Sequence, residues 1–267
     1  MYDVAYMGYS WEVMSNLVSS KIFDLKKVIG VCGRMNPKQY EIIQKNHLLY
    51  LEISDARELE QIDGFLDNEY VIIHKFEFII PQVIVDKHSI FNFHGGSLKN
   101  NRGAHPMVRS ILNMDTETCL SLYKLTKGID CGLLLGSYIV KITEQDTTSS
   151  LNKKMMKGIP CLLEDLQKYL EGKIEGELIT SGKYYPKVTE ADYTIDICRD
   201  SVKQICAKIR SQEGYRGALV VKDNRRYRIV KYHISSNVQP ICSRRCENNK
   251  FVVNEKYDRL ECILQQE

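Results

Sequence analysis

The sequence has no apolar run close to the ~18 residues that a membrane-spanning helix needs. Its opening, MYDVAYMGYSWEVM, lacks the basic segment of a secretory signal peptide and carries Asp3 early. The glycine that ends the first expected strand, Gly8, does not begin a GxGxxG fingerprint, so a nicotinamide dinucleotide is not indicated. The lack of a membrane-spanning run and of a signal peptide leads us to expect a cytoplasmic protein.

Metal-binding cysteine patterns are missing as well. The nine cysteines contain no CxxC pair, and Cys242 and Cys246 lack a second pair of ligands at zinc spacing. We therefore expect cysteines that behave as small hydrophobes in a reducing compartment, and no metal.

A strong excess of charge of one sign is also absent. The chain carries 37 basic and 34 acidic residues, a net charge of +3. Nucleic-acid binding usually requires a clear basic excess, so a nucleic-acid partner is not expected from composition. The 267 residues, 43% of them hydrophobic, are enough for one large domain and a small one.

Strand and helix patterns alternate through the first two thirds of the chain. We expect strands at 2–8, 28–32, 48–51, 70–73, 89–94, 119–125 and 133–142, and helices at 10–20, 40–46, 55–66, 105–112 and 148–170. This alternation predicts an α/β fold with a Rossmann-like, doubly wound, mostly parallel sheet. Ligands of such sheets bind at the carboxyl ends of the strands.

The pattern changes near residue 180. The segment SGKYYPKVTEADYTID is polar and rich in turn residues, which is typical of a linker. A helix at 201–210 and short strands at 218–221, 226–233, 251–253 and 260–264 then suggest a small β-rich module resembling an open barrel. We predict a catalytic domain at 1–182 and a C-terminal β-rich domain at 183–267.

Polar residues that suit acyl-type transfer gather around the strand at 89–94. Strand alternation places Asn92 and His94 on one face, and Asp130 follows in a glycine-flanked loop. An amide donor, a histidine base and a carboxylate can together stabilise an oxyanion and remove a proton from an attacking amine. Spacing alone leaves open a capping Asn, a strand-end His and a loop Asp with no chemical role.

The motifs and their order resemble the folate-dependent formyltransferase family, which includes sugar-nucleotide and methionyl-tRNA formyltransferases. The resemblance is carried by Asn92-Phe93-His94, by Ser97-Leu98 with Arg102-Gly103 and Pro106, and by Lys127 to Gly132. It implies that Asn92, His94 and Asp130 are catalytic and that N10-formyltetrahydrofolate donates the formyl group. Lys99-Asn100 depart from the family's Leu-Pro, and Cys131 from its Thr or Ser.

We also expect two sets of binding residues, of which the resemblance implies the donor-binding set. The donor-binding candidates are Phe76, Glu77, Phe78, Ile79 and Gly128. The candidates for binding the acceptor substrate are Gly95, Ser97, Arg102, Gly103, Tyr9 and Trp11.

The acceptor is less well defined than the donor. We expect the primary amine of a nucleotide-linked amino sugar, a 3-amino or 4-amino deoxy sugar used in surface polysaccharides, because the segment after Gly33 lacks a long basic insertion. Methionyl-tRNA is the alternative, and a catalytically inactive ligand-binding protein is a third reading. Because the expected substrate is a small molecule, we expect neither a nucleic acid nor a membrane as a partner. The sequence leaves open whether the protein forms a homodimer.

Overall fold

The computed structural model describes residues 1–67, 69–215, 217–247 and 249–267, without the side chain of residue 238. The chain forms two compact units. The first comprises residues 1–103, 119–140 and 154–184, and the second comprises residues 104–118, 141–153 and 185–267. The predicted domain boundary at 182/183 stays a prediction.

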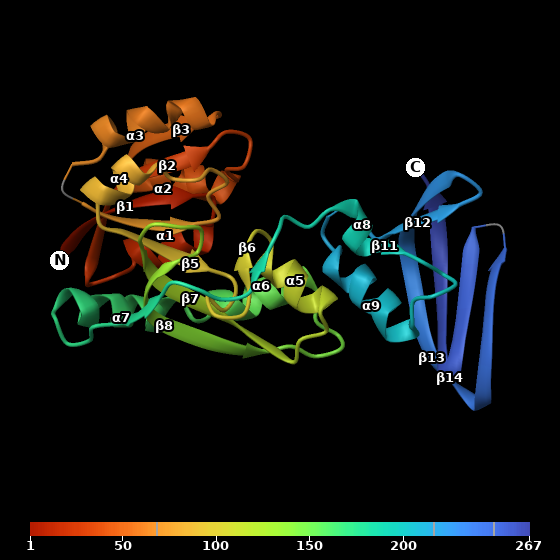
Figure 1. Ribbon diagram of the computed structural model, residues 1–267. Helices are drawn as coiled ribbons and strands as arrows, with labels where there is room; N and C mark the ends of the chain where they lie inside the picture. Colours follow the sequence, from red (N-terminus) through yellow and green to blue (C-terminus); the bar gives the residue numbers. More distant parts are fainter. Residues whose placement is uncertain (68, 216, 248) are drawn as a thin grey trace. The chain divides into compact units, whose positions relative to one another are not determined.

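A mixed sheet organises the first unit (Figure 1). Its strand order is β3 (Leu49–Ile53), β2 (Phe23–Val31), β1 (Tyr2–Gly8), β4 (Tyr70–His74), β5 (Ile90–His94), β7 (Glu117–Leu125), β8 (Gly132–Lys141) and β9 (Glu177–Ile179). The pairs among β3, β2, β1, β4 and β5 are all parallel, whereas β5 pairs with β7 in the antiparallel sense. This parallel-dominated α/β architecture confirms the predicted fold class.

Helices on this sheet are held by apolar side chains. On one face, Leu59 of the 3-10 turn η1 (Ala56–Leu59), Ile62 of α3 (Glu60–Phe65) and Ile84 of α4 (Gln82–Lys87) join one buried cluster with Met7 and Ile73. The buried helix α1 (Trp11–Val18) contacts α2 (Pro37–Lys45) and α7 (Ile159–Leu170). The ring of Tyr169 in α7 packs edge-on against Phe91 of β5, with centroids 6.0 Å apart.

The helix predicted at 148–170 is two helices, α6 (Thr148–Met156) and α7. Pro160 lies in the first turn of α7, where its missing N–H costs no helical hydrogen bond. A Cβ at Gly158 would lie 2.3 Å from the Tyr138 ring, so glycine permits the close approach at this break. The single-helix prediction was wrong because the apolar spacing continues across the proline.

The second unit contains a four-stranded open sheet in the order β11 (Thr194–Ile195), β12 (Leu219–Lys222), β13 (Arg225–Glu247) and β14 (Lys250–Gln266). Side chains of α9 (Val202–Ser211), such as Ile205, share one buried cluster with Phe251 and Leu260. The short strands predicted at 226–233, 251–253 and 260–264 lie inside β13 and β14, which are longer. Their pairing shifts register between Ser236 and Ile241, which explains the interrupted apolar pattern.

The remaining elements are short. They are α5 (Pro106–Leu112), α8 (Glu190–Tyr193), and the two-stranded pair of β6 (Arg102–Gly103) with β10 (Tyr184–Tyr185). None of the described helices is both long enough and apolar enough to cross a membrane.

Candidate active site at the end of β5

The carboxyl end of β5 presents the predicted catalytic pair. Asn92 lies opposite Tyr123 of β7 in the antiparallel register, and His94 lies opposite Ser121. Asn92 is half-buried and His94 is only 6% exposed. The Ser121 hydroxyl donates to the Gly96 carbonyl at 2.8 Å, which fixes the glycine turn that follows His94.

The two ring nitrogens of His94 have different partners. Nε2 lies 2.8 Å from the carbonyl oxygen of Asn101, and Nδ1 lies 3.6 Å from Oδ1 of Asp130. A carbonyl only accepts hydrogen bonds, so Nε2 carries the hydrogen in the neutral ring and Nδ1 is the proton acceptor. The Asp130 carboxylate faces that acceptor atom.

Asp130 is held by contacts on both carboxylate oxygens. The Gly103 backbone N–H donates to Oδ2 at 2.7 Å, and the Tyr123 hydroxyl donates to Oδ1 at 2.9 Å. The backbone of Asp130 has a φ of 47°, a left-handed conformation that is uncommon for a non-glycine residue. The loop therefore places this carboxylate beside His94 at a cost in backbone strain, which is typical of a functional position.

Tyr123 is a site residue that the sequence analysis missed. Its hydroxyl accepts a hydrogen bond from Nδ2 of Asn92 at 3.0 Å while it donates to Asp130. Burial, and then the charge of Asp130, raise the pKa of Tyr123 well above its usual range, so the hydroxyl keeps its hydrogen. Because the hydroxyl has only that hydrogen to donate, the amide of Asn92 must present its NH2 group to Tyr123.

Arg102 lies beside this triad in the same unit. Its Nη1 donates to Sγ of Cys131 at 2.7 Å, and its Nη2 donates to the carbonyl of Gly182 at 2.9 Å. Across the described residues, no carboxylate forms an ion pair with this guanidinium. The Arg102 guanidinium is therefore fixed in place by two neutral partners.

The predicted donor-binding segment follows β4. The rings of Phe76 and Phe78 lie 5.7 Å apart in an edge-to-face arrangement and pack against the buried apolar cluster of the first unit. Ile79 is 74% exposed. Glu77 accepts from Nε of Arg34 at 2.8 Å and from the Tyr9 hydroxyl at 3.4 Å.

Other predicted binding residues occupy turns around the same strand ends. Trp11 begins α1, and Nζ of Lys38 lies 4.1 Å from its ring centroid. Gly95 and Ser97 are half-buried in the turn after β5. Gly128 has a φ of 109°, and a Cβ there would lie 3.3 Å from the Cys131 sulfur. The structure thus brings Asn92, His94, Asp130, Arg102 and Gly103 together, whereas the ring of Trp11 contacts Lys38 instead.

The end of β4 adds two titratable residues that the sequence analysis passed over. His74 is 3% exposed, and its Nδ1 has no hydrogen-bond partner. Burial, then the charges of Lys75 and His94, hold the pKa of His74 well below 6.5. Lys75 has a left-handed φ of 56°, and burial lowers its pKa. The sequence shows that both residues lie at the end of a strand, but it does not show that they are buried.

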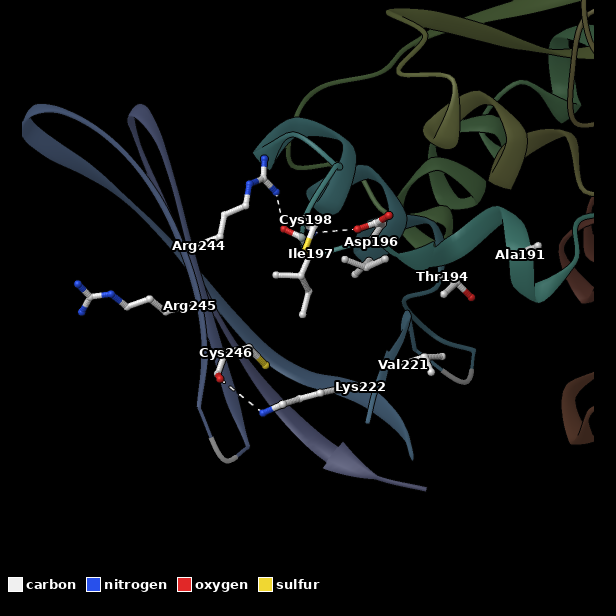
Figure 2. Close-up of a pocket in the computed structure, with 11 residues that line it drawn as sticks. Ala191, Thr194, Asp196, Ile197, Cys198, Val221, Lys222, Arg244, Arg245 and Cys246 are labelled. Atoms are coloured by element: carbon white, nitrogen blue, oxygen red, sulfur yellow. Dashed lines mark hydrogen bonds between the residues drawn. The ribbon is translucent and has the colours of Figure 1, made fainter. Parts of the chain in front are cut away.

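The second unit has a separate open concavity of about 910 Å³ (Figure 2). Figure 2 shows Arg244 bonded to the carbonyl of Ile197, at 2.6 Å, and Lys222 directed toward the carbonyl of Cys246. No residue predicted to bind donor or acceptor lines it. Within the described residues, no group of three or more His, Cys, Asp or Glu side chains could hold a metal ion.

Comparison with known proteins gives the family. The formyl transferase family model matches residues 40–162, a range that includes Asn92, His94, Asp130 and Tyr123. Over 179 residues, 66% of the chain, the sequence is 30% identical to a methionyl-tRNA formyltransferase of Francisella tularensis subsp. novicida. Over residues 40–162 the chain is a formyltransferase-family sequence. It spans 56% of the length of that relative, little more than half.

Solved formyltransferase structures share the fold over the full chain. A sugar 3N-formyltransferase, WlaRD, gives a TM-score of 0.74 at 15% identity and is covered over 98% of its length by 99% of this chain. The N-formyltransferase of Helicobacter canadensis gives a TM-score of 0.70 at 17% identity, with 99% and 100% covered. These likenesses show that the chain shares its fold with the two solved formyltransferases.

Proposed function

We propose that this chain transfers a formyl group from N10-formyltetrahydrofolate to the primary amine of a nucleotide-linked amino sugar. The observation that carries the proposal is a chain of contacts in which Asn92 bonds to Tyr123, Tyr123 bonds to Asp130, and Asp130 faces His94. The arrangement provides a base, a charge that stabilises the protonated base, and an oriented amide donor.

The chemistry assigned to each residue follows from its contacts. Nδ1 of His94 takes the proton that the acceptor amine loses as it attacks, because the other ring nitrogen is already bonded to the Asn101 carbonyl. Asp130 stabilises the resulting imidazolium. One N–H of Asn92 is bonded to Tyr123, and the second, which makes no hydrogen bond to the part of the chain that the structure describes, donates to the oxyanion that develops on the formyl group.

Donor and acceptor binding are proposed for two neighbouring sets of residues. The bound folate supplies an activated formyl group on N10. The backbone of residues 76–79 and the Phe76–Phe78 pair, with Gly128, would hold its pterin ring. The structures that resemble the chain include one determined with 5-N-formyl-THF and one determined with folinic acid, which supports a folate donor. Tyr9, Trp11, Gly95, Ser97, Arg102 and Gly103 are proposed for the acceptor.

An amino-sugar nucleotide is favoured by the full-length structural likenesses. The WlaRD structure is described as a sugar 3N-formyltransferase in the presence of dTDP, and the Helicobacter canadensis structure contains dTDP-3-aminofucose. An acceptor of this type carries a diphosphate, which one fixed cation such as Arg102 can recognise. We infer a 3-amino or 4-amino deoxy sugar, and a role in surface polysaccharide synthesis in the cytoplasm.

Methionyl-tRNA remains the second candidate, because curated relatives at 27–30% identity carry that name. The charge distribution also bears on it. Residues 183–267 contain 17 basic and 11 acidic residues, a net +6, whereas residues 1–182 contain 20 and 23, a net −3. Several of those cations are already paired, as Arg226 and Arg228 are with Glu190.

The deciding experiment is an acceptor panel with N10-formyltetrahydrofolate. We expect product with one or more dTDP- or UDP-linked 3-amino or 4-amino sugars, with only a shallow dependence on salt. A tRNA acceptor would release counterions from many phosphates, so its affinity would fall steeply between 50 and 200 mM salt, by roughly 10³-fold or more. Formylated methionyl-tRNA with that salt dependence, and no sugar product, would replace the sugar proposal with the second candidate.

A further inference from the structure

The segment Thr180–Lys183, here called the strap, is bonded to the loop that carries Arg102. The Lys183 N–H donates to the carbonyl of Lys99 at 2.8 Å, and the Arg102 N–H donates to the carbonyl of Lys183 at 3.0 Å. These reciprocal backbone bonds attach the strap to the acceptor-side loop over residues 99–102. A third bond runs from the Arg102 side chain to the carbonyl of Gly182, at 2.9 Å.

The strap approaches this loop too closely for a side chain at its centre. A Cβ at Gly182 would lie 2.6 Å from the carbonyl oxygen of Lys99 and 2.7 Å from that of Leu98. Real Cβ atoms do not come so near to backbone oxygens, so any larger residue would push the strap outward. Glycine at 182 is therefore what brings its carbonyl within reach of the guanidinium.

Cys131 adds two further contacts to this attachment. Its sulfur accepts from Nη1 of Arg102 at 2.7 Å and lies 3.7 Å from the carbonyl of Thr180, to which its S–H donates. The cysteine therefore bonds both the guanidinium and the strap. It follows Asp130 directly in sequence, so the same turn positions the catalytic carboxylate and this thiol.

We propose that the strap, through Gly182 and together with Cys131, is a positioning element that fixes the Arg102 guanidinium for the anionic part of the acceptor. Two of the guanidinium's N–H groups are held by neutral partners, a thiol and a carbonyl, which orient the group without cancelling its charge. A cation held in this way discriminates between acceptors by the placement of a phosphate. The inference rests on the proposed acceptor class for the meaning of that anion.

Four variants separate positioning from general damage. Gly182→Ala pushes the strap outward, Cys131→Ala removes the thiol, and Cys131→Ser restores a group that can both donate and accept. Gly64→Ala adds the same methyl group at a glycine with no atom within 4 Å of the new Cβ, and is the matched control. Each is compared by its thermal midpoint, its kinetic constants for donor and acceptor, and its affinity for inorganic pyrophosphate by calorimetry.

We expect Gly182→Ala and Cys131→Ala to raise the acceptor KM and the pyrophosphate Kd about 5- to 20-fold. The donor KM and kcat should stay within about threefold, and Cys131→Ser should recover most of the loss. Gly64→Ala should match the wild type. Equal pyrophosphate binding by wild type, Gly182→Ala and Cys131→Ala would overturn the proposal, as would losses of the same size for donor and acceptor.

The pyrophosphate measurement does not depend on catalysis. A wild-type protein that formylates no amino sugar, but binds pyrophosphate through the strap-dependent Arg102, would refute the proposed function and retain the positioning role. A protein that formylates the sugar with an unchanged acceptor KM in both variants would retain the function and refute the positioning role. If Gly182→Ala does not fold, the Cys131→Ala and Cys131→Ser pair decides the question.

Discussion

The Tyr123 hydroxyl donates to Oδ1 of Asp130 over 2.9 Å, and this bond joins the last part of β7 to the loop that follows it. The same hydroxyl accepts from Asn92 on the neighbouring strand. One phenol therefore sets both the position of the carboxylate and the orientation of the amide. The proposed catalytic group consists of four side chains, of which the sequence analysis named three.

Replacement of Tyr123 by Phe removes both bonds and keeps the ring. A hydrogen bond to a charged group is worth about 1.5–3 kcal/mol, so we expect kcat to fall ~10- to 100-fold. Tyr70→Phe on β4 is the control, because the Tyr70 ring packs on Phe91 but its hydroxyl forms no hydrogen bond among the described residues. Steady-state turnover measures the effect, and an unchanged kcat in Tyr123→Phe would show that the bond only stabilises the fold.

Replacement of His94 by Asn should abolish the proposed base. We expect kcat to fall roughly 10²- to 10⁴-fold, the usual contribution of a general base. The thermal midpoint should change little, since the side chain lies at a strand end and not within the apolar cluster. Single-turnover rates with saturating donor provide the measurement. Near wild-type turnover would remove His94 from the mechanism.

His74 should make the folded state sensitive to acid. Its pKa is depressed in the folded state, so below pH 6.5 the unfolded chain binds a proton that the folded chain does not. The free energy of unfolding therefore falls as the pH drops through 6.5, by about 1 kcal/mol between pH 6.5 and 5.5 from this residue. Urea unfolding of wild type and His74→Phe at both pH values measures the difference.

A control separates His74 from histidines in general. His233 is exposed on β13, so His233→Phe should retain the wild-type pH dependence, whereas His74→Phe should lose about 1 kcal/mol of it. Parallel pH dependence of wild type and His74→Phe would mean that His74 is not buried in its neutral form.

Gly8 should tolerate no side chain, because it lies where β1 meets β4. Its φ is 131°, and a Cβ would lie 1.9 Å from the His74 carbonyl oxygen. We expect Gly8→Ala to lower the free energy of unfolding by about 3 kcal/mol or more, through strain and a displaced strand end. Gly33→Ala, at φ 70° with no atom within 4 Å, should cost only about 1–2 kcal/mol. Equal losses would show that the crowding at Gly8 relaxes freely.

Strand periodicity was enough to predict that Asn92 and His94 lie on one face at the end of a strand. Asn92 and His94 share a face at a strand end because side chains alternate, and the alternating strands and helices fixed the parallel sheet. The catalytic assignment of Asp130 came from the family resemblance, since a loop carries no periodic signal. The structure places Asp130 beside His94, but its role stays a prediction until the variants are measured.

Tyr123 could not be predicted from its own neighbourhood. It lies in the run LSLYKL, where an aromatic residue is typical of a buried strand. Its role depends on the register that sets it opposite Asn92, and register between strands 31 residues apart is not readable from local pattern. The strap was missed for a similar reason: its glycine resembles a linker residue, and only its distance from Leu98 and Lys99 reveals its use.

The order of the contacts along the chain has a consequence for synthesis. Asn92, Tyr123 and Asp130 fall within 39 consecutive residues, but Gly182 follows Asp130 by 52 residues. At elongation rates of about 5–20 residues per second, that gap corresponds to roughly 3–10 s on the ribosome. A nascent chain would thus contain its proposed catalytic residues for several seconds before the strap could hold Arg102, so we expect acceptor selectivity to arise after those residues have been made.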